Sequence, residues 1–409
     1  MTGRERLRAC FRHEETDRPP IDFSGHRSSG ISAIAYGRLR RFLGLDPKVI
    51  RVYDPIQQLA IVHEDVLKRF AVDTIELGRG FACADTDWAD WVLPDGTACQ
   101  MPAWAAPRRE QGQWVLRSKT GRIIARMPDG ALYFEQTYWP YAERKDADFS
   151  DLRQALAESM WTAIASPPGQ LLGAANGWDL LAEGARKLRK STDRAIVALF
   201  GGNLLEVGQF LFRNDNFYML LAEEPDRAHA FLDAVVELHL VNLDKFLDAV
   251  SASVDVIVFG DDLGMQTGPQ ISPAMYREFF KPRHAKMWRH VKERSGLKIN
   301  LHCCGGVRQL LPDLIEAGLD AINPVQITCE GMDGAELKQE FGRDLVFWGG
   351  GCDTRTILPK GRPEEVADHV RRQVRILGKG GGFVFQQVHN IMADVPPENI
   401  VAMFDAAAR

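Results

Sequence analysis

His302 and Cys304 are the residues whose types and spacing point most directly to chemistry. They form an H-x-C triplet at the end of a predicted strand, residues 298–302. Along an extended backbone, residues i and i+2 face the same side, so the triplet offers one imidazole nitrogen and one thiolate sulfur to a metal ion. This donor pair favours a borderline-soft ion, of which zinc is the commonest. The alternative is structural, because cysteine is among the most buried residue types and a strand-end histidine is often merely hydrogen-bonded.

A third ligand would come from another strand end. His389 and Cys352 are the two candidates, and Asp261 or Asp262 offers a carboxylate oxygen. Three protein ligands with an open fourth position are typical of a catalytic zinc site. Asp261 and Asp262 are also candidate catalytic groups, because one of two adjacent carboxylates on an extended strand end can face a pocket and act as a general base. The alternative for either one is an aspartate that only caps a turn in the motif GDDLG.

Further polar side chains follow predicted strands directly, where a barrel places its catalytic loops. We expect these side chains to line a substrate pocket, with Arg27 or Arg355 holding an anionic group. The candidate substrate-binding residues are His26, Arg27, Asn203, Asn323, Gln326, Asp353, Arg355 and Gln387. Because so many ionisable and amide groups are expected at one end of the fold, an enzyme is favoured over a non-catalytic binding protein.

Strand-length apolar runs alternate with helical patterns along most of the chain, which is typical of a parallel α/β architecture. The predicted strands are residues 20–23, 72–77, 195–200, 255–259, 298–302, 320–323, 345–348 and 383–386, and the clearest helical patterns are residues 226–248, 272–294, 307–317 and 363–377. Most of the strands are continuously apolar, as strands buried on both faces should be. We therefore predict the fold class α/β, a (β/α)8 TIM barrel, with residues 1–409 as a single domain.

Residues 84–140 interrupt this alternation. The segment has no helical period, and it carries turn signals at Asp95-Gly96, at residues 119–121 and at Asp129-Gly130. Such signals between short apolar runs predict antiparallel hairpins. The fold prediction therefore includes an inserted β-hairpin lobe over residues 84–140.

Composition excludes several classes of protein. The 409 residues are 45% hydrophobic and 26% charged, which is typical of a globular protein, and the net charge of -5 disfavours nucleic acid as a partner. No apolar run reaches the ~20 residues of a membrane span, and the charged N-terminal segment lacks the apolar stretch of a secretory signal. Seven thinly spread cysteines are an odd number and do not predict a disulfide framework. We therefore expect a cytoplasmic protein with a small-molecule substrate and no membrane or nucleic-acid partner.

The motifs that carry these residues resemble the uroporphyrinogen decarboxylase superfamily, which includes zinc-dependent methyltransferases acting on methylated corrinoid proteins. The resemblance is best from about Asp255 to the C-terminus. It is carried by GDDLG (260–264), ISPAMYREFFKP (271–282), NLHCCGG (300–306), LIEAGLDAINPVQ (314–326), GGGCDT (349–354) and VPPENI (395–400). The resemblance implies a (β/α)8 barrel and, by analogy alone, a homodimer.

Two departures from the family patterns guide the functional interpretation. Uroporphyrinogen decarboxylases have an early R-Q-A-G-R segment, whereas this chain has SGHRSSG (24–30) with Arg27 as its one arginine. Decarboxylation of a porphyrinogen with eight carboxylates is therefore disfavoured. Methylcobamide:coenzyme M methyltransferases have H-x-C followed by a late cysteine, and here that position falls close to His389. The resemblance thus implies the zinc ligands His302, Cys304 and His389, with Cys352 as an alternate.

The leading hypothesis is a zinc-dependent methyltransferase that moves a methyl group between a small methylated substrate or thiol-type acceptor and a corrinoid. The corrinoid would be supplied in trans, free or on a carrier protein, because this chain has no corrinoid-binding motif. Asp262, with Asp261, would orient or deprotonate the substrate. One alternative is a metal-independent decarboxylase or lyase of a small carboxylic acid or tetrapyrrole. The other is a non-catalytic protein that binds a corrinoid or another tetrapyrrole.

Overall fold

A parallel sheet of seven strands forms the centre of the protein, in the order β17-β16-β15-β14-β11-β10-β3. The computed structural model describes residues 1–164 and 168–408, without the side chains of residues 172 and 173. The strands are β3 (Thr74–Glu76), β10 (Ala195–Gly201), β11 (Val256–Gly260), β14 (Lys298–His302), β15 (Ala321–Asn323), β16 (Val346–Trp348) and β17 (Phe383–Val384). Each of them falls within a predicted strand or extends it by one residue.

The remaining predicted strand, residues 20–23, closes this sheet into a barrel. Asp22 N donates to Phe385 O at 2.9 Å and Phe385 N donates to Pro20 O at 2.8 Å, so the segment pairs with the chain just after β17. On its other side, Asp73 N, just before β3, donates to Ile21 O at 2.8 Å. The predicted (β/α)8 barrel is confirmed, with one strand reduced to a single parallel bridge between Ile21 and Phe385.

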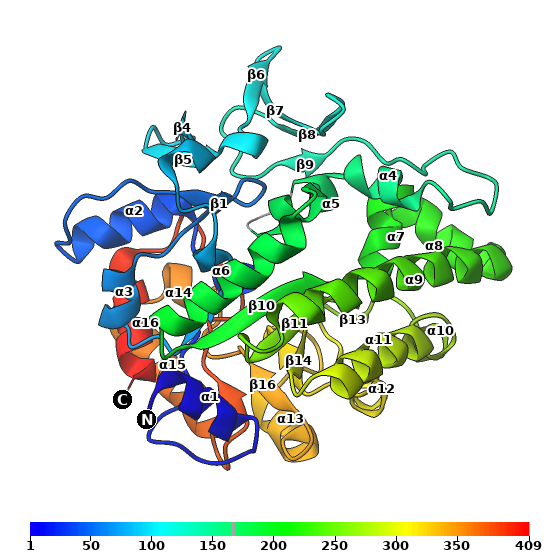
Figure 1. The fold of residues 1–409 in the computed structure, drawn as a ribbon. Coiled ribbons are helices and arrows are strands. Elements are labelled where there is room, and N and C mark those ends of the chain that lie inside the picture. The colour runs from blue at the N-terminus through cyan, green and yellow to red at the C-terminus, as the bar shows by residue number, and fades with distance from the viewer. Residues whose placement is uncertain (165–167, 409) are drawn as a thin grey trace.

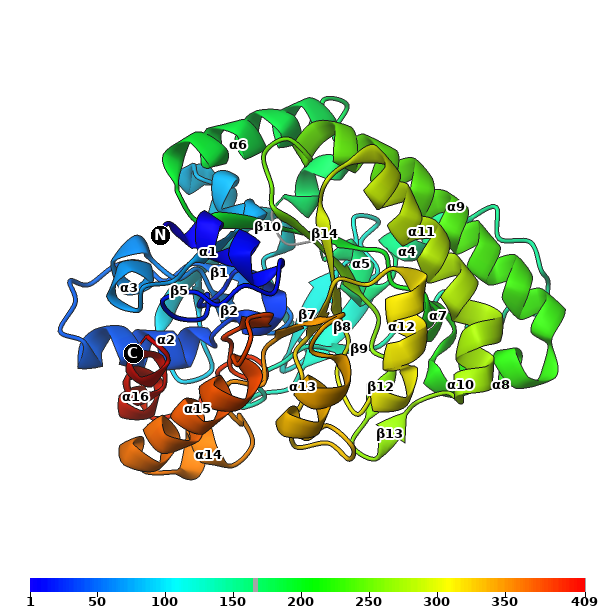
Figure 2. The same cartoon turned by 90° about the horizontal axis from the view of Figure 1, so that it is seen from below.

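Helices surround the barrel, as Figures 1 and 2 show from two directions. They are α1 (Gly3–Cys10), α2 (Ala33–Phe42), α3 (Glu64–Arg69), α4 (Leu152–Ala157), α5 (Met160–Ala163), α6 (Gly177–Ser191), α7 (Leu205–Phe212), α8 (Asn214–Glu223), α9 (Pro225–Val250), α10 (Pro273–Met275), α11 (Lys281–Arg294), α12 (Leu311–Ala317), α13 (Gly334–Phe341), α14 (Ile357–Lys360), α15 (Pro363–Leu377) and α16 (Pro397–Ala407). None of the helices in the described ranges has the length and apolar character needed to cross a bilayer.

One predicted helix is divided. Residues 272–294 form α10, a π-helical turn η6 (Tyr276–Phe280) and α11. Pro282 lies in the first turn of α11 and has no N–H to donate to the carbonyl four residues earlier. The missing N–H of Pro282 therefore explains why regular α-helical hydrogen bonding is interrupted just before α11. A π-helical segment inside a helix is typically a single turn, as it is here.

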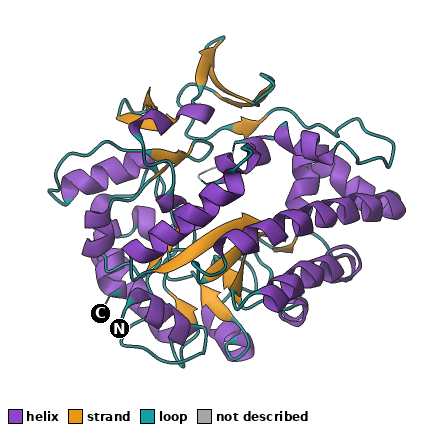
Figure 3. Cartoon of the chain, in the orientation of Figure 1, coloured by secondary structure: helices purple, strands orange, loops and turns teal. Residues whose placement is uncertain are grey.

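Short antiparallel strands occupy much of the segment between β3 and α4, drawn in orange above the barrel in Figure 3. They are β4 (Trp88–Val92), β5 (Ala98–Pro102), β6 (Arg108–Glu110), β7 (Gln113–Arg117), β8 (Ile123–Met127) and β9 (Glu135–Gln136), in sheets of two and four strands. The β4–β5 hairpin encloses Asp95-Gly96, and the β7–β8 hairpin encloses residues 118–122. Two-stranded pairs also form from β1 (Val52–Asp54) with β2 (Leu59–Ala60) and from β12 (Gly264–Met265) with β13 (Gly268–Pro269).

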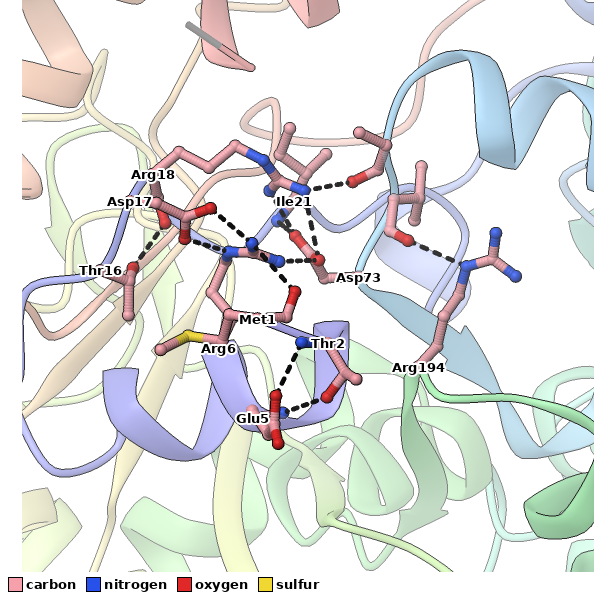
Figure 4. Close-up of polar contacts among 12 residues, drawn as sticks. Met1, Thr2, Glu5, Arg6, Thr16, Asp17, Arg18, Ile21, Asp73 and Arg194 are labelled. Carbon is pink, nitrogen blue, oxygen red and sulfur yellow. Dashed lines mark hydrogen bonds and ion pairs between the residues drawn. The ribbon is translucent and has the colours of Figure 1, made fainter.

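The barrel interior is apolar, and α1 contributes to it. Leu7 and Cys10 of α1 belong to the same buried cluster as Val197, Val258 and Trp348 of the strands. A buried aspartate, Asp73, anchors the segment that includes residues 18–21. It accepts from Arg6 Nη1 at 2.6 Å and from Ile21 N at 2.8 Å, and it also forms an ion pair with Arg18 (Figure 4). These contacts hold the closing segment of the barrel against α1 and β3.

Candidate metal centre

Three side chains predicted as metal ligands meet at the carboxyl ends of the strands. The ligand atoms of His302, Cys304 and His389 all lie within 4.8 Å of one another. His302 Nε2 is 3.5 Å from Cys304 Sγ, and the two imidazole rings have centroids 5.7 Å apart. Tetrahedral zinc, with bonds of about 2.3 Å to sulfur and about 2.0 Å to nitrogen, separates two such ligand atoms by roughly 3.5 Å. The nitrogen and sulfur therefore already have the spacing of a zinc pair.

Backbone contacts between neighbouring loops bring these residues together. His302 ends β14, and Cys303 N donates to Asn323 O at the end of β15 at 2.7 Å. Gly305 has φ +93°, and a Cβ there would lie 2.3 Å from the carbonyl carbon of Gly264. The loop after β14 thus packs main chain against main chain on the loop after β11, which only glycine at residue 305 permits.

The proton of the neutral His302 ring is assigned by its neighbours. Asn323 Nδ2 donates to Trp348 O at 2.9 Å, so the other amide atom of Asn323 is the oxygen. That Oδ1 lies 2.7 Å from His302 Nδ1, which must therefore be the donor. The lone pair is left on Nε2, the atom that faces Cys304 Sγ. A histidine that donates its second N–H to a fixed acceptor is the usual arrangement of a metal ligand.

Burial sets the protonation of the three ligands. It lowers the pKa of His302, and burial together with the neighbouring His302 lowers the pKa of His389 to about 4. Both rings are therefore neutral and able to ligate near pH 7. Burial, followed by the charge of Asp262, raises the pKa of the Cys304 thiol well above its usual range. A cation at this position would reverse that effect, because metal binding displaces the thiol proton.

Asp262 and Glu206 are the acidic groups beside the cluster. Asp262 Oδ1 accepts from Cys304 N at 2.7 Å and lies 3.7 Å from His302 Nε2. Glu206 Oε2 accepts from Asn203 Nδ2 at 2.6 Å and from Asp262 N at 3.1 Å. Burial, then the charges of Asp262 and Asp261, raise the pKa of Glu206 well above its usual range. Glu206 is thus a neutral carboxylic acid next to a carboxylate.

Sequence reasoning missed Glu206. It lies in the first turn of α7, three residues after the predicted pocket residue Asn203. The available signal was an isolated acid in a helix with no other charged residue, LEVGQFLF. An acidic residue is common in the first turn of a helix, so its relation to Asp262 appears only in three dimensions.

Asp261 has a different place from Asp262. Its two carboxylate oxygens accept from Leu205 N at 3.1 Å and from Glu206 N at 3.0 Å, and one of them lies 3.3 Å from His284 Nε2. The side chain is completely buried. Asp261 therefore satisfies the first N–H groups of α7 and does not face the three ligands, which is the capping alternative rather than the catalytic one.

Three of the predicted pocket residues hold the loops around the cluster. Gln326 Oε1 accepts from Gly305 N at 3.0 Å, and Asn203 binds Glu206 as described. Arg355 Nη1 donates to Gln266 Oε1 at 2.6 Å, which joins the loop after β16 to the turn between β12 and β13. These contacts shape the site from the loops after β10, β15 and β16.

Most of the remaining predicted residues lie in structural contacts. Cys352 is completely buried with its sulfur 3.8 Å from Asp353 O, outside the three-ligand group of the described residues. Asp353 accepts from Arg355 N and from the Thr356 hydroxyl, so it caps a turn. Arg27 Nε pairs with Asp54 at 2.9 Å. Gln387 is completely buried, with no hydrogen-bond partner for either amide atom among the described residues. His26 and Asn323 are buried, and Asn323 Oδ1 lies 2.7 Å from His302 Nδ1.

Comparison with solved structures gives the same fold. A methyltransferase from Methanosarcina mazei is similar over 100% of this chain and 98% of its own, with a TM-score of 0.59 and 17% sequence identity. At that identity the likeness concerns the fold alone. It agrees with the closed barrel.

Comparison with known sequences places the chain in a family. Uroporphyrinogen decarboxylases from Methylococcus capsulatus and Serratia proteamaculans are 27% and 29% identical over 190 residues, 46% of this chain in each case and 50% and 49% of theirs. The chain thus spans about half the length of the curated relatives it matches. The uroporphyrinogen decarboxylase (URO-D) family model matches residues 185–409, more than half of the chain. The predicted resemblance is confirmed: the protein belongs to the uroporphyrinogen decarboxylase family.

Proposed function

We propose that this protein is a zinc-dependent methyltransferase that moves a methyl group between a small methylated substrate or thiol-type acceptor and a corrinoid supplied in trans. The observation that carries the proposal is the convergence of one thiol and two neutral imidazoles within 4.8 Å at the mouth of the barrel. The likeness of the fold to the Methanosarcina mazei methyltransferase supports it.

The donor set fits zinc. His302 Nε2 carries a free lone pair, Cys304 Sγ is 3.5 Å away, and the pKa of His389 near 4 keeps that ring neutral. His302, Cys304 and His389 would hold the ion and leave a fourth position for substrate. When bound, zinc lowers the pKa of a coordinated thiol or hydroxyl, so that an anion is present at neutral pH. One thiolate and two neutral imidazoles leave a net positive charge there, which favours an anionic acceptor.

Asp262 is the group that would handle the proton. Its carboxylate is about one third exposed and lies 3.7 Å from His302 Nε2, so it borders the same space as the ligands. Glu206 holds the Asp262 backbone N–H, and its raised pKa makes it the neutral member of the acidic pair. Asp262 would orient the acceptor and take up its proton as a general base.

A metal-independent decarboxylase is the second candidate. It is favoured by the curated relatives and by the neutral Glu206 carboxyl, which can deliver a proton to a carbanion left by loss of carbon dioxide. Arg27 as the one arginine of SGHRSSG argues against a substrate with many carboxylates. The two candidates differ in their need for a metal.

The test combines metal analysis with a methyl-transfer assay. We expect about one zinc per chain, transfer of a methyl group to cob(I)alamin or from methylcobalamin, loss of transfer after chelation, and its recovery on addition of zinc. We expect Asp262→Asn to keep its zinc and to lose activity by about 10²-fold or more, the usual contribution of a general base. Metal-free protein with full activity, or wild-type protein that binds no zinc, would reject the proposal.

A further inference from the structure

A closed ring of hydrogen bonds lies beneath the metal centre. His26 Nδ1 is 3.0 Å from Ser28 Oγ, Ser28 Oγ is 2.8 Å from Asn323 Oδ1, Asn323 Nδ2 is 2.9 Å from Gln386 Oε1, and Gln386 Oε1 is 3.1 Å from His26 Nε2. All four side chains are at least nine-tenths buried. Asn323 is also the partner of His302 Nδ1, so the ring touches the metal centre at one point.

The orientation of each member of the ring follows from Trp348. Its backbone carbonyl can only accept, so the Asn323 atom 2.9 Å from it is the nitrogen and Oδ1 is an acceptor. The Gln386 atom opposite Asn323 Nδ2 must then be its oxygen. The Ser28 hydroxyl, 2.8 Å from the acceptor Asn323 Oδ1, must direct its hydrogen there. Ser28 Oγ therefore has only lone pairs to offer to His26.

Both nitrogens of His26 consequently face acceptors. Nδ1 faces the lone pairs of Ser28 Oγ, and Nε2 faces Gln386 Oε1 at 3.1 Å and Asp22 Oδ2 at 3.3 Å. A neutral imidazole has one donor, so it would leave one of these contacts between two lone pairs. Both contacts are satisfied only when His26 carries a proton on each nitrogen and is an imidazolium.

Asp22 is the counter-ion that makes this charge tolerable. It is completely buried and accepts from Trp348 Nε1 at 2.8 Å and from Thr74 Oγ1 at 2.7 Å. Burial by itself would raise the pKa of Asp22, but the bonds from His26, Thr74 and Trp348 outweigh it, and the pKa lies below its usual value. A buried charge of either sign is costly when unpaired, so Asp22 and His26 depend on each other.

We infer that Asp22 and His26 are positioning residues of the metal centre: their ion pair satisfies the two acceptors that face His26 and so stabilises the ring in the arrangement that Trp348 O selects, in which the His302 proton stays on Nδ1 and the Nε2 lone pair is kept for a metal. The inference rests on the proposed metal site but not on the reaction. Outer partners of a ligating histidine typically contribute 10- to 100-fold to metal affinity.

Asp22→Asn tests the inference, because it removes the charge and keeps the shape. We expect the zinc affinity, measured by competition with a chromophoric chelator, to fall several-fold, less than the 10- to 100-fold typical of a direct partner of a ligating histidine. Asp313→Asn is the control, since Asp313 is also a buried aspartate and its ion pairs are with Arg277 and Lys281 rather than with members of the ring. The control should change zinc affinity less than twofold. Ser28→Ala, which keeps the ion pair, serves if Asp22→Asn does not fold, and it should weaken zinc binding several-fold.

A second readout does not need the metal. Nitrogen-15 NMR of the imidazoles in metal-free protein at pH 7 reports which ring nitrogens carry protons. We expect His302 protonated on Nδ1 alone and His26 protonated on both nitrogens, and we expect Asp22→Asn to remove one proton from His26. A neutral His26 in the wild type, or wild-type zinc affinity in Asp22→Asn, overturns the inference. Wild-type protein that binds no zinc overturns the proposed function, while the NMR spectrum still decides the protonation of the ring.

Discussion

Cys304 and Cys352 are both thiols in loops that follow barrel strands, yet only Cys304 has two imidazoles beside it. Cys304→Ser replaces a soft ligand by a weak one, so we expect bound zinc to fall from about one per chain to a small fraction, as measured by elemental analysis. Cys352→Ser buries a hydroxyl in an apolar site and should cost about 1–3 kcal/mol of stability while zinc content is unchanged. If Cys352→Ser lost its zinc and Cys304→Ser kept it, Cys352 rather than Cys304 would be the metal ligand.

Substitutions of the adjacent Asp261 and Asp262 should have different effects on the free energy of unfolding and on activity. Asp261→Ala removes the acceptor for two N–H groups of α7 and should lower the free energy of unfolding by about 1–3 kcal/mol in urea titrations. Its zinc content should equal that of the wild type. Asp262→Asn should behave in the opposite way, with nearly unchanged unfolding and lost turnover. A stable but inactive Asp261 variant would contradict this division.

The metal-ligand residues could be predicted from the sequence, but the hydrogen-bond partners that orient them could not. H-x-C spacing and the resemblance together indicated His302, Cys304 and His389, because these depend on residue type and position along strands. The ring proton of His302 depends on which way Asn323 turns, and that is set by the carbonyl of Trp348 on a neighbouring strand. The choice between Asp261 and Asp262 likewise needed the position of α7.

At the scale of elements, the closing strand of the barrel, residues 20–23, forms a single parallel bridge with its neighbour and is also held by hydrogen bonds and ion pairs to the Asp73 side chain. Asp73 holds it through Arg6, Arg18 and Ile21 N (Figure 4). Asp73→Ala leaves two guanidinium groups without their buried partner, so we expect a loss of about 3–5 kcal/mol in the free energy of unfolding.

An exposed ion pair provides the control for this prediction. Asp405→Ala breaks a pair with Arg69 in which both side chains are more than one third exposed. The expected cost is at most about 1 kcal/mol, because solvent screens such pairs. Equal losses in Asp73→Ala and Asp405→Ala, measured by thermal and urea unfolding, would show that Asp73 is not the anchor.

Elements with strong local signals were predictable. The helix 363–377 begins at a proline and coincides with α15, and the hairpins at Asp95-Gly96 and Asp129-Gly130 follow their turn residues. The pairing of β1 with β2 was not predicted, since three- and two-residue strands carry too little periodicity. The first barrel strand was predicted, but its reduction to one bridge follows from contacts with distant segments.

For the molecule as a whole, the buried carboxyl group of Glu76 makes the free energy of unfolding depend on pH. Burial raises its pKa from 4.5 to about 7. Between these values the folded protein binds more protons than the unfolded chain, so the free energy of unfolding falls as pH rises from about 4.5 to about 7. Glu76→Gln stays neutral and should exceed the wild type in stability above pH 7 by about 3 kcal/mol, a gain that vanishes near pH 4.5. Urea titrations at several pH values measure the difference, and a destabilised variant at pH 8 would contradict it.

The contact between Gly264 and Gly305 limits how this scaffold can be diversified. A methyl group at residue 305 would overlap the neighbouring main chain at 2.3 Å, and one at residue 264 would lie 2.5 Å from Cys304 O. Even alanine at either position must therefore displace the peptide that carries the thiol or the one that follows Asp262. Libraries that seek new substrates should therefore hold both glycines constant, together with Gln326, whose side chain accepts from Gly305 N.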